Sequence, residues 1–138
     1  MKKITVILTL DDRGGIGFDG KRQSRDREVI KDICLCSDGK IYMSEYSAKL
    51  FGEYGDKIEV VDEPVKKCPD GCTAFIECQN IAPYIEYIEK IVIYKWNKIY
   101  PAELFFDLSD MLVAEKMTEQ REFVGFSHEK ITKEVYEI

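Results

Sequence analysis

The chain has 138 residues, of which 45% are hydrophobic and 33% charged, and its formal net charge is −6 at pH 7. This composition excludes an intrinsically disordered chain and predicts a single domain over residues 1–138. The negative charge argues against nucleic acid as a partner, because tight binding to phosphates needs a basic surface.

The sequence also argues against a membrane partner. No apolar run approaches the roughly 18 residues that span a bilayer, and the N-terminus lacks the features of a signal peptide. The five cysteines are an odd number, as in a chain whose thiols stay reduced. Their spacings, Cys34-x-Cys36 and Cys68-x3-Cys72, differ from the paired C-x2-C of structural zinc sites. We therefore expect a cytoplasmic protein without a metal.

The first half of the chain predicts alternating strands and helices. Lys3–Leu10 is β-branched and apolar, as in a strand buried on both faces, and four glycines within seven positions mark a loop over residues 11–20. Ser24 is the expected N-cap of a helix over residues 25–35, which has an apolar stripe. Next we expect strands at Lys40–Met43, Lys57–Val61 and Cys72–Cys78, a helix at Glu45–Phe51 that Gly52 stops, and a loop at Val65–Gly71.

The second half predicts one more helix and three strands. Ala82–Lys90 has a proline at its start and apolar residues on one side, which is typical of a short helix. Ile91–Asn97 carries the strongest strand signal. Met111–Met117 and Thr132–Ile138 alternate apolar and polar residues, which predicts an antiparallel pair. The fold class is therefore α/β, a mixed sheet flanked by short helices and ending in an antiparallel C-terminal hairpin.

This order of elements, with a glycine-rich loop after the first strand, resembles dihydrofolate reductase and the related pyrimidine reductases of riboflavin synthesis. Arg13–Gly20 (RGGIGFDG) stands where that family has a loop of the form N/D-x-G-I-G-x-x-G. Ile41–Leu50 (IYMSEYSAKL) stands where it has I-x-M-G-R-x-T-x-x-x-L. Its later segments correspond to Ile93–Lys95, Ala102–Asp107 and the strand with Val135 and Tyr136. The resemblance implies one shortened, divergent dihydrofolate reductase-like domain.

The positions that hold the cofactor in that family differ here. Ser44-Glu45 replaces a Gly-Arg pair, which places an anion where the family's arginine meets the 2′-phosphate of NADPH. Glu77-Cys78 replaces the paired glycine that admits the nicotinamide diphosphate. The resemblance therefore implies a degraded NADPH site, with NADPH as a disfavoured cofactor.

The substrate positions differ as well. Gln23-Ser24 replaces the family's proline-tryptophan, and the substrate-binding carboxylate would fall near Val29. An offset residue, Asp26 or Glu28, would have to take its role.

Polar residues around the glycine loop are the candidates for ligand binding. Backbone N–H groups near Gly15 and Gly17 could cradle a phosphate, and Arg22 and Arg25 could clamp a carboxylate or phosphate. The alternatives are a surface loop that uses glycine for its turns, and arginines that pair with nearby carboxylates. The full set of candidates is Asp11, Asp12, Gly15, Gly17, Arg22, Ser24, Arg25, Asp26, Met43, Ser47 and Glu77. The lone histidine, His128, is far from Cys78 along the chain, so a Cys–His pair is the least favoured reading.

Three functions remain open at this point. The favoured one is a reductase-like domain that binds a small anionic or heterocyclic ligand without hydride transfer. The second is an NADPH-dependent reductase of a pterin or pyrimidine. The third is protein association or a homodimer through the aromatic residues between Tyr84 and Phe106.

Overall fold

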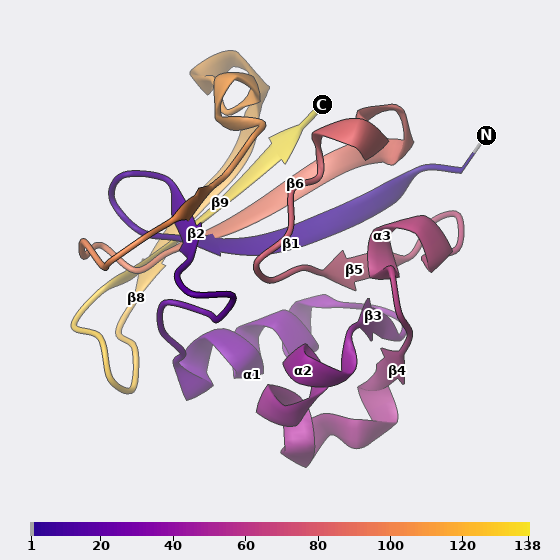
Figure 1. Cartoon of the computed structure of the whole chain (residues 1–138), viewed down its shortest axis with the longest axis horizontal. Coiled ribbons are helices and arrows are strands. Elements are labelled where there is room, and N and C mark those ends of the chain that lie inside the picture. Colours follow the sequence, from indigo (N-terminus) through magenta and orange to yellow (C-terminus); the bar gives the residue numbers. More distant parts are fainter. Residues whose placement is uncertain (1) are drawn as a thin grey trace.

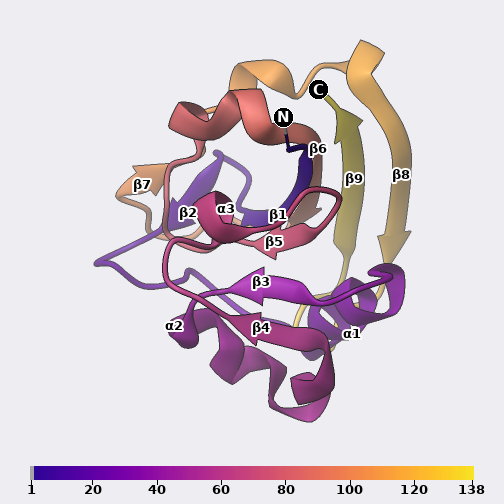
Figure 2. The same cartoon turned by 90° about the vertical axis from the view of Figure 1, so that its right-hand side faces the viewer.

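The computed structural model describes residues 2–138, which form a seven-stranded mixed sheet with helices on both faces (Figure 1). The strand order is β4-β3-β5-β1-β6-β9-β8 (Figure 2). Neighbours from β4 to β6 are parallel, whereas β9 runs antiparallel to both β6 and β8. The predicted mixed α/β sheet with a C-terminal antiparallel pair is therefore confirmed. The strands are β1 Ile4–Leu10, β3 Ile41–Met43, β4 Ile58–Val60, β5 Thr73–Phe75, β6 Ile88–Lys95, β8 Met117–Phe123 and β9 Ile131–Glu137.

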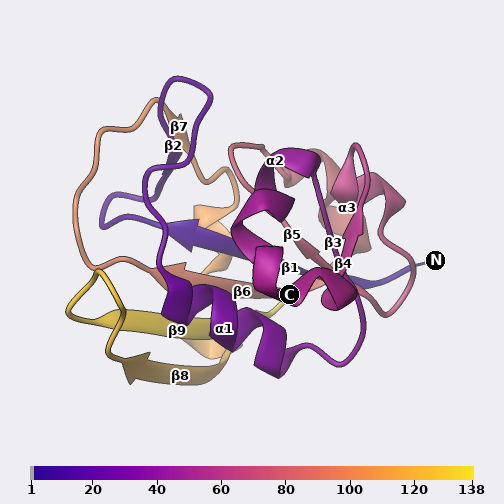
Figure 3. The ribbon, with the colours of Figure 1, turned by 90° about the horizontal axis from the view of Figure 1, so that it is seen from below.

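One face of the sheet is covered by α1 Arg27–Cys36, α2 Glu45–Ala48 and the 3-10 helix η1 Lys49–Lys57 (Figure 3). Val29, Ile30 and Ile33 of α1 recur at helical spacing and pack in one apolar cluster with Ile7 of β1 and Val92 of β6. Because this stripe faces the sheet, α1 fixes the position of its own N-terminus at the carboxyl end of β1.

The opposite face is covered by α3 Pro64–Lys67, the 3-10 helix η2 Ala82–Tyr87 and two 3-10 turns, η3 Ser109–Met111 and η4 Ala114–Lys116. Ile4, Val6 and Leu8 point into this second cluster, with Val65 from α3 and Phe106. As predicted, β1 is buried on both faces. Within residues 2–138 no helix has both the length and the apolar character needed to cross a membrane.

Several predicted boundaries in the first half are wrong. Asp26, and not Ser24, caps α1, since its side chain accepts the N–H of Glu28. The same carboxylate also binds the distant turn at Phe126 and Ser127, which holds it in place at the start of the helix. The helix after β3 breaks where predicted, because the backbone leaves the helical region at Phe51, directly before Gly52, although further 3-10 turns continue η1 to Lys57. Three of the four residues of α3, which begins at a proline, lie within the predicted loop Val65–Gly71.

The predicted strand at Met111–Met117 is also wrong, because η3 and η4 occupy most of it and β8 begins at Met117. β8 is an edge strand whose central residues, Thr118–Glu122, are all exposed. Its polar sequence therefore lacks the apolar alternation that marks a half-buried strand. Similarly, β6 begins at Ile88, so the predicted helix Ala82–Lys90 ends at Tyr87 as η2.

The glycine-rich segment is folded more tightly than an open loop. β2 Gly15–Gly17 pairs antiparallel with β7 Leu104–Phe105 in a second, two-stranded sheet. The buried Asp11 carboxylate accepts the backbone N–H groups of Arg13 and Gly15, both at 2.8 Å, and the Gln23 amide at 3.0 Å. Burial opposes ionisation of Asp11, but these bonds outweigh it and lower the pKa of the carboxyl.

We predict that Gly15→Ala destabilises the protein by about 2 kcal/mol through overpacking. A Cβ at Gly15 would lie 2.6 Å from Gln23 Nε2 and 2.7 Å from Ala102 Cβ. Gly52→Ala is the matched control, since a Cβ there meets nothing within 4 Å. Urea unfolding of both variants measures the difference, and equal midpoints would show that the glycine is not required by packing.

Candidate functional site

Four predicted site residues line one small cavity at the carboxyl ends of β1 and β5, beside the N-terminus of α1. Ser24, Arg25, Asp26 and Glu77 come from two distant segments, and the cavity volume is about 10 Å³. This is room for about one water molecule. The folded chain therefore brings the predicted residues together, but their own contacts fill the space between them.

Arg22 and Glu77 form a paired, largely buried ion pair at this cavity. Arg22 Nε donates to Glu77 Oε2 at 2.8 Å and Arg22 Nη2 to Oε1 at 2.9 Å, with side-chain exposures of 19% and 4%. Ser47 Oγ donates to the same carboxylate at 2.8 Å, and the guanidinium lies 4.1 Å from the centroid of the Tyr46 ring. Three candidates from separate parts of the sequence thus form one cluster in which the charge of Arg22 is already matched.

A second cluster joins Ser24, His128 and Asp26. His128 Nδ1 lies 2.9 Å from Asp26 Oδ2, and His128 Nε2 lies 3.1 Å from Ser24 Oγ. The Tyr100 hydroxyl is also 2.9 Å from Nε2, and the imidazole stacks on Trp96 with the ring centroids 4.6 Å apart. The His128 side chain is only 2% exposed, so its position is fixed on every side.

Asp26 is the centre of this second cluster. Besides capping α1, its carboxylate accepts the backbone N–H groups of Phe126 and Ser127, both at 2.8 Å, from the turn between β8 and β9. The Asp26 side chain is fully buried, and burial opposes its ionisation. The bonds from Phe126, His128, Ser127 and Glu28 outweigh burial and lower the pKa of Asp26 to about 2.

The other candidates have different surroundings. Met43 lies in the core and is fully buried. Asp12 and Arg25 are exposed, and among residues 2–138 neither side chain forms an ion pair. A Cβ at Gly17 would lie 3.0 Å from Cys78 Sγ, so this glycine serves packing within the chain.

The glycine segment has few free donors for a phosphate. Its N–H groups donate to protein oxygens: Arg13 and Gly15 to Asp11, Gly14 to the Asp11 carbonyl, Phe18 to Lys21 and Asp19 to Glu103. In residues 2–138 we also find no group of three His, Cys, Asp or Glu side chains that could hold a metal ion.

Sequence reasoning missed His128, Tyr100 and Trp96 as members of the site. His128 lies 102 positions from Asp26, and nothing local to either residue indicates that they meet. The available signal was weak: one histidine in the chain, within the Gly125–His128 turn of a predicted hairpin.

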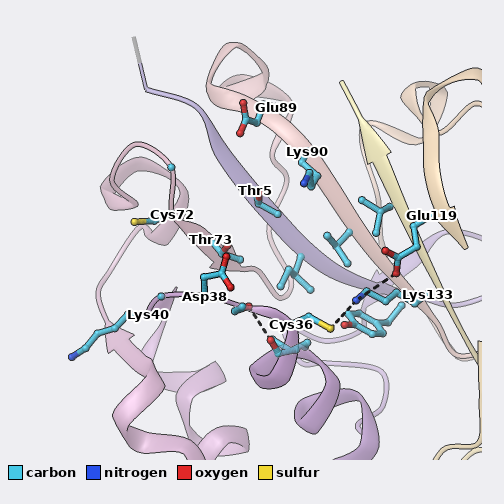
Figure 4. Close-up of a pocket in the computed structure, with 18 of the residues that line it drawn as sticks. Thr5, Cys36, Asp38, Lys40, Cys72, Thr73, Glu89, Lys90, Glu119 and Lys133 are labelled. Carbon is cyan, nitrogen blue, oxygen red and sulfur yellow. Dashed lines mark hydrogen bonds and ion pairs between the residues drawn. The ribbon is translucent and has the colours of Figure 1, made fainter. Parts of the chain in front are cut away.

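A larger hollow of about 490 Å³ lies elsewhere, at the amino ends of β1 and β5 beyond the C-terminus of α1 (Figure 4). Its most buried charged residue is Lys133, whose Nζ lies 3.2 Å from Asp32 and 3.3 Å from Cys36 Sγ. Glu119 is 3.9 Å away on the rim. The ammonium is matched by these carboxylates, and no residue is shared with the 10 Å³ cavity.

The sheet order, the helices on both faces and the closing hairpin define a dihydrofolate reductase-like fold. The dihydrofolate reductase from Enterococcus faecalis, solved in complex with NADP(H) and RAB-propyl, matches the structure with a TM-score of 0.65. The match covers 98% of this chain and 95% of that one, at 12% sequence identity. No protein-family model matches the sequence, and no match was found among the curated proteins. The predicted fold resemblance is confirmed.

We predict that Asp26→Asn lowers the free energy of unfolding by about 3 kcal/mol at pH 7, because an amide nitrogen would face buried donors. The Asp26 pKa is depressed from 3.8 to about 2, so its ionic contribution, about 2 kcal/mol, is present above pH 4. That contribution is lost as the pH falls toward 2. Asp12→Asn, at an exposed aspartate, is the control and should change stability little. Urea unfolding at pH 7 and pH 3 measures both variants; an Asp26→Asn effect as small as that of the control would contradict the structural role.

Proposed function

We propose that this chain is a dihydrofolate reductase-like domain that binds a small anionic or heterocyclic ligand and does not transfer hydride from NADPH. The observation that carries the proposal is the buried Arg22–Glu77 pair. It supports a degraded NADPH site, because Glu77 stands at the position that the family resemblance gives to a glycine beside the cofactor diphosphate.

The surroundings of Glu77 favour the same conclusion. The next residue, Cys78, packs its sulfur against Gly17, where the glycine segment passes close by. Beside it lies a shallow hollow of about 400 Å³ whose charged residues are Asp19 and Glu103. A diphosphate placed there would meet two carboxylates and no cation, which is electrostatically unfavourable.

The substrate side of the site also differs from a pterin reductase. An ionised carboxylate offers about four lone-pair positions. Asp26 receives donors from Glu28 N, Phe126 N, Ser127 N, Ser127 Oγ and His128 Nδ1. No acceptor capacity is left for the ring N–H groups of a heterocycle, so Asp26 does not take the role of a substrate carboxylate.

Of the two arginines predicted to clamp a ligand, Arg25 is the one left for it. Arg22 is matched by Glu77, whereas Arg25 is exposed at the edge of the cavity and forms no ion pair within residues 2–138. A guanidinium that is free of partners binds carboxylates and phosphates through paired hydrogen bonds. An anionic group on the ligand is therefore the feature that the site supports best.

The alternative of protein association loses much of its motivation. Of the aromatic residues that suggested an interface, Tyr94, Trp96 and Phe106 are buried in the core, and Phe105 is exposed. A homodimer through this region would have to use the exposed Phe105 and the half-buried Tyr84, Tyr87 and Tyr100.

A thermal-shift titration tests the proposal. We expect no stabilisation by NADPH, NADP or dihydrofolate, and stabilisation by a member of a panel of inorganic phosphate, citrate and uridine monophosphate. A ligand at a hundred times its Kd stabilises the folded state by about 2.7 kcal/mol. Arg25→Ala should abolish the shift, and Arg13→Ala, at another exposed arginine, should leave it unchanged. Saturable binding of NADPH would overturn the proposal and make the NADPH-dependent reductase the leading function.

A further inference from the structure

Ser24, His128 and Asp26 are connected in the order that activates a serine. The carboxylate contacts Nδ1 of the imidazole at 2.9 Å, and the hydroxyl contacts Nε2 at 3.1 Å. The fold does not require the contact between Ser24 and His128. Phe126 and Ser127 already fasten the turn to Asp26 through their N–H groups, so the Ser24 contact is not required to hold the turn in place.

We propose that Ser24 is a nucleophile, with His128 as its general base and Asp26 as the residue that orients the base. The substrate class is a small carboxylic ester whose anionic group pairs with Arg25. The anionic group rests on the proposed function above; the nucleophile rests on the geometry of Ser24, His128 and Asp26 alone.

The surroundings of the imidazole define its tautomer. Nδ1 faces a buried carboxylate that only accepts hydrogen bonds, so in the neutral imidazole, the form that acts as a base, Nδ1 carries the proton and Nε2 presents a lone pair. Two hydroxyls, those of Ser24 and Tyr100, can donate to that lone pair. Trp96 stacks on the ring and prevents it from turning away from Ser24.

The reaction balances with water as the only co-reactant. Ser24 Oγ attacks the ester carbonyl while its proton moves to His128 Nε2, and the carbon–oxygen bond to the alcohol breaks as Nε2–H returns the proton to the leaving oxygen. Water then attacks the acyl-serine by the same route and releases the acid. While His128 is protonated, Nε2–H can donate to the Tyr100 oxygen, and Asp26 stabilises the positive ring.

Charge that develops on the carbonyl oxygen also has donors nearby. The backbone N–H groups of Ser24 and Arg25 donate to no protein acceptor among the hydrogen bonds of residues 2–138. Ser24 itself is only half-buried, so an ester can approach from the side of the exposed Arg25. Such N–H groups stabilise an oxyanion where they point toward it.

The test is covalent labelling with a fluorophosphonate, which forms a serine–phosphorus bond and releases fluoride. Intact-mass measurement and peptide mapping should find one adduct, at Ser24, absent from Ser24→Ala. Ser109→Ala is the control, because this exposed serine donates to the Phe106 carbonyl and contacts none of Ser24, His128 and Asp26, and it should label at the wild-type rate. His128→Asn should slow labelling at least a hundredfold, the usual scale for loss of a general base.

Two further measurements keep the outcomes separate. If His128→Asn fails to fold, Ser24→Thr replaces it as the test variant: it retains a hydroxyl beside Nε2 and is expected to label. In the wild-type protein, an adduct at a residue other than Ser24 would overturn the assignment of Ser24 as the nucleophile. Labelling of Ser24 that saturating citrate does not slow would retain the nucleophile and reject the anionic ligand at Arg25. A thermal shift with citrate but no adduct at Ser24 would retain the ligand site and overturn the proposed relay.

Discussion

The carboxylate of Asp26 is the interaction on which the arrangement of the site depends. It joins the start of α1 to the turn between β8 and β9, about a hundred positions along the chain, through five donors. Without it, the N-terminus of α1 would lose its cap and the turn would lose four of its hydrogen bonds. The position of His128, and with it the polar cluster at the carboxyl end of β1, follows from this one buried charge.

At the same edge of the sheet, polar side chains are satisfied by one another within a dihydrofolate reductase-like fold. The apolar residues of β1, β6 and α1 build an architecture that matches the Enterococcus faecalis enzyme at 12% identity. The polar residues at the edge are paired with one another: Arg22 with Glu77, and Asp26 with His128. Each pair links segments that are far apart in the sequence and holds the small cavity closed.

The sequence predicted what depends on short-range patterns. The continuous β-branched, apolar run in Ile4–Leu10 was sufficient for β1, because such a run indicates a strand buried on both faces. The stripe Val29–Ile30–Ile33 was sufficient for α1, because the buried face of a helix repeats every three to four residues. Prediction from the sequence failed where the role of a residue depends on a partner far along the chain. Asp26 and Ser24 are both good N-caps, and only the turn at Phe126–Ser127, which needs an acceptor, makes Asp26 the cap. Likewise, β8 is polar because it lies at the sheet edge, and its pairing with β9 is invisible in its own residues.

In the cluster of Ser24, His128 and Asp26, the same residues stabilise the fold and carry the proposed chemistry. Which variant can separate the two roles therefore depends on the residue that is changed. Removing Asp26 takes away both the cap of α1 and the partner of His128, so loss of reactivity in that variant says nothing about chemistry. Ser24 is different, because it is half-buried and its hydroxyl is connected to the Asp26 carboxylate through the imidazole of His128, which it contacts at Nε2. A change at Ser24 therefore leaves the carboxylate, the turn and the helix cap in place. Reactivity that is lost when the Ser24 hydroxyl is removed is therefore due to the hydroxyl itself. This distinguishes a nucleophilic serine from a serine whose hydroxyl only forms a structural hydrogen bond.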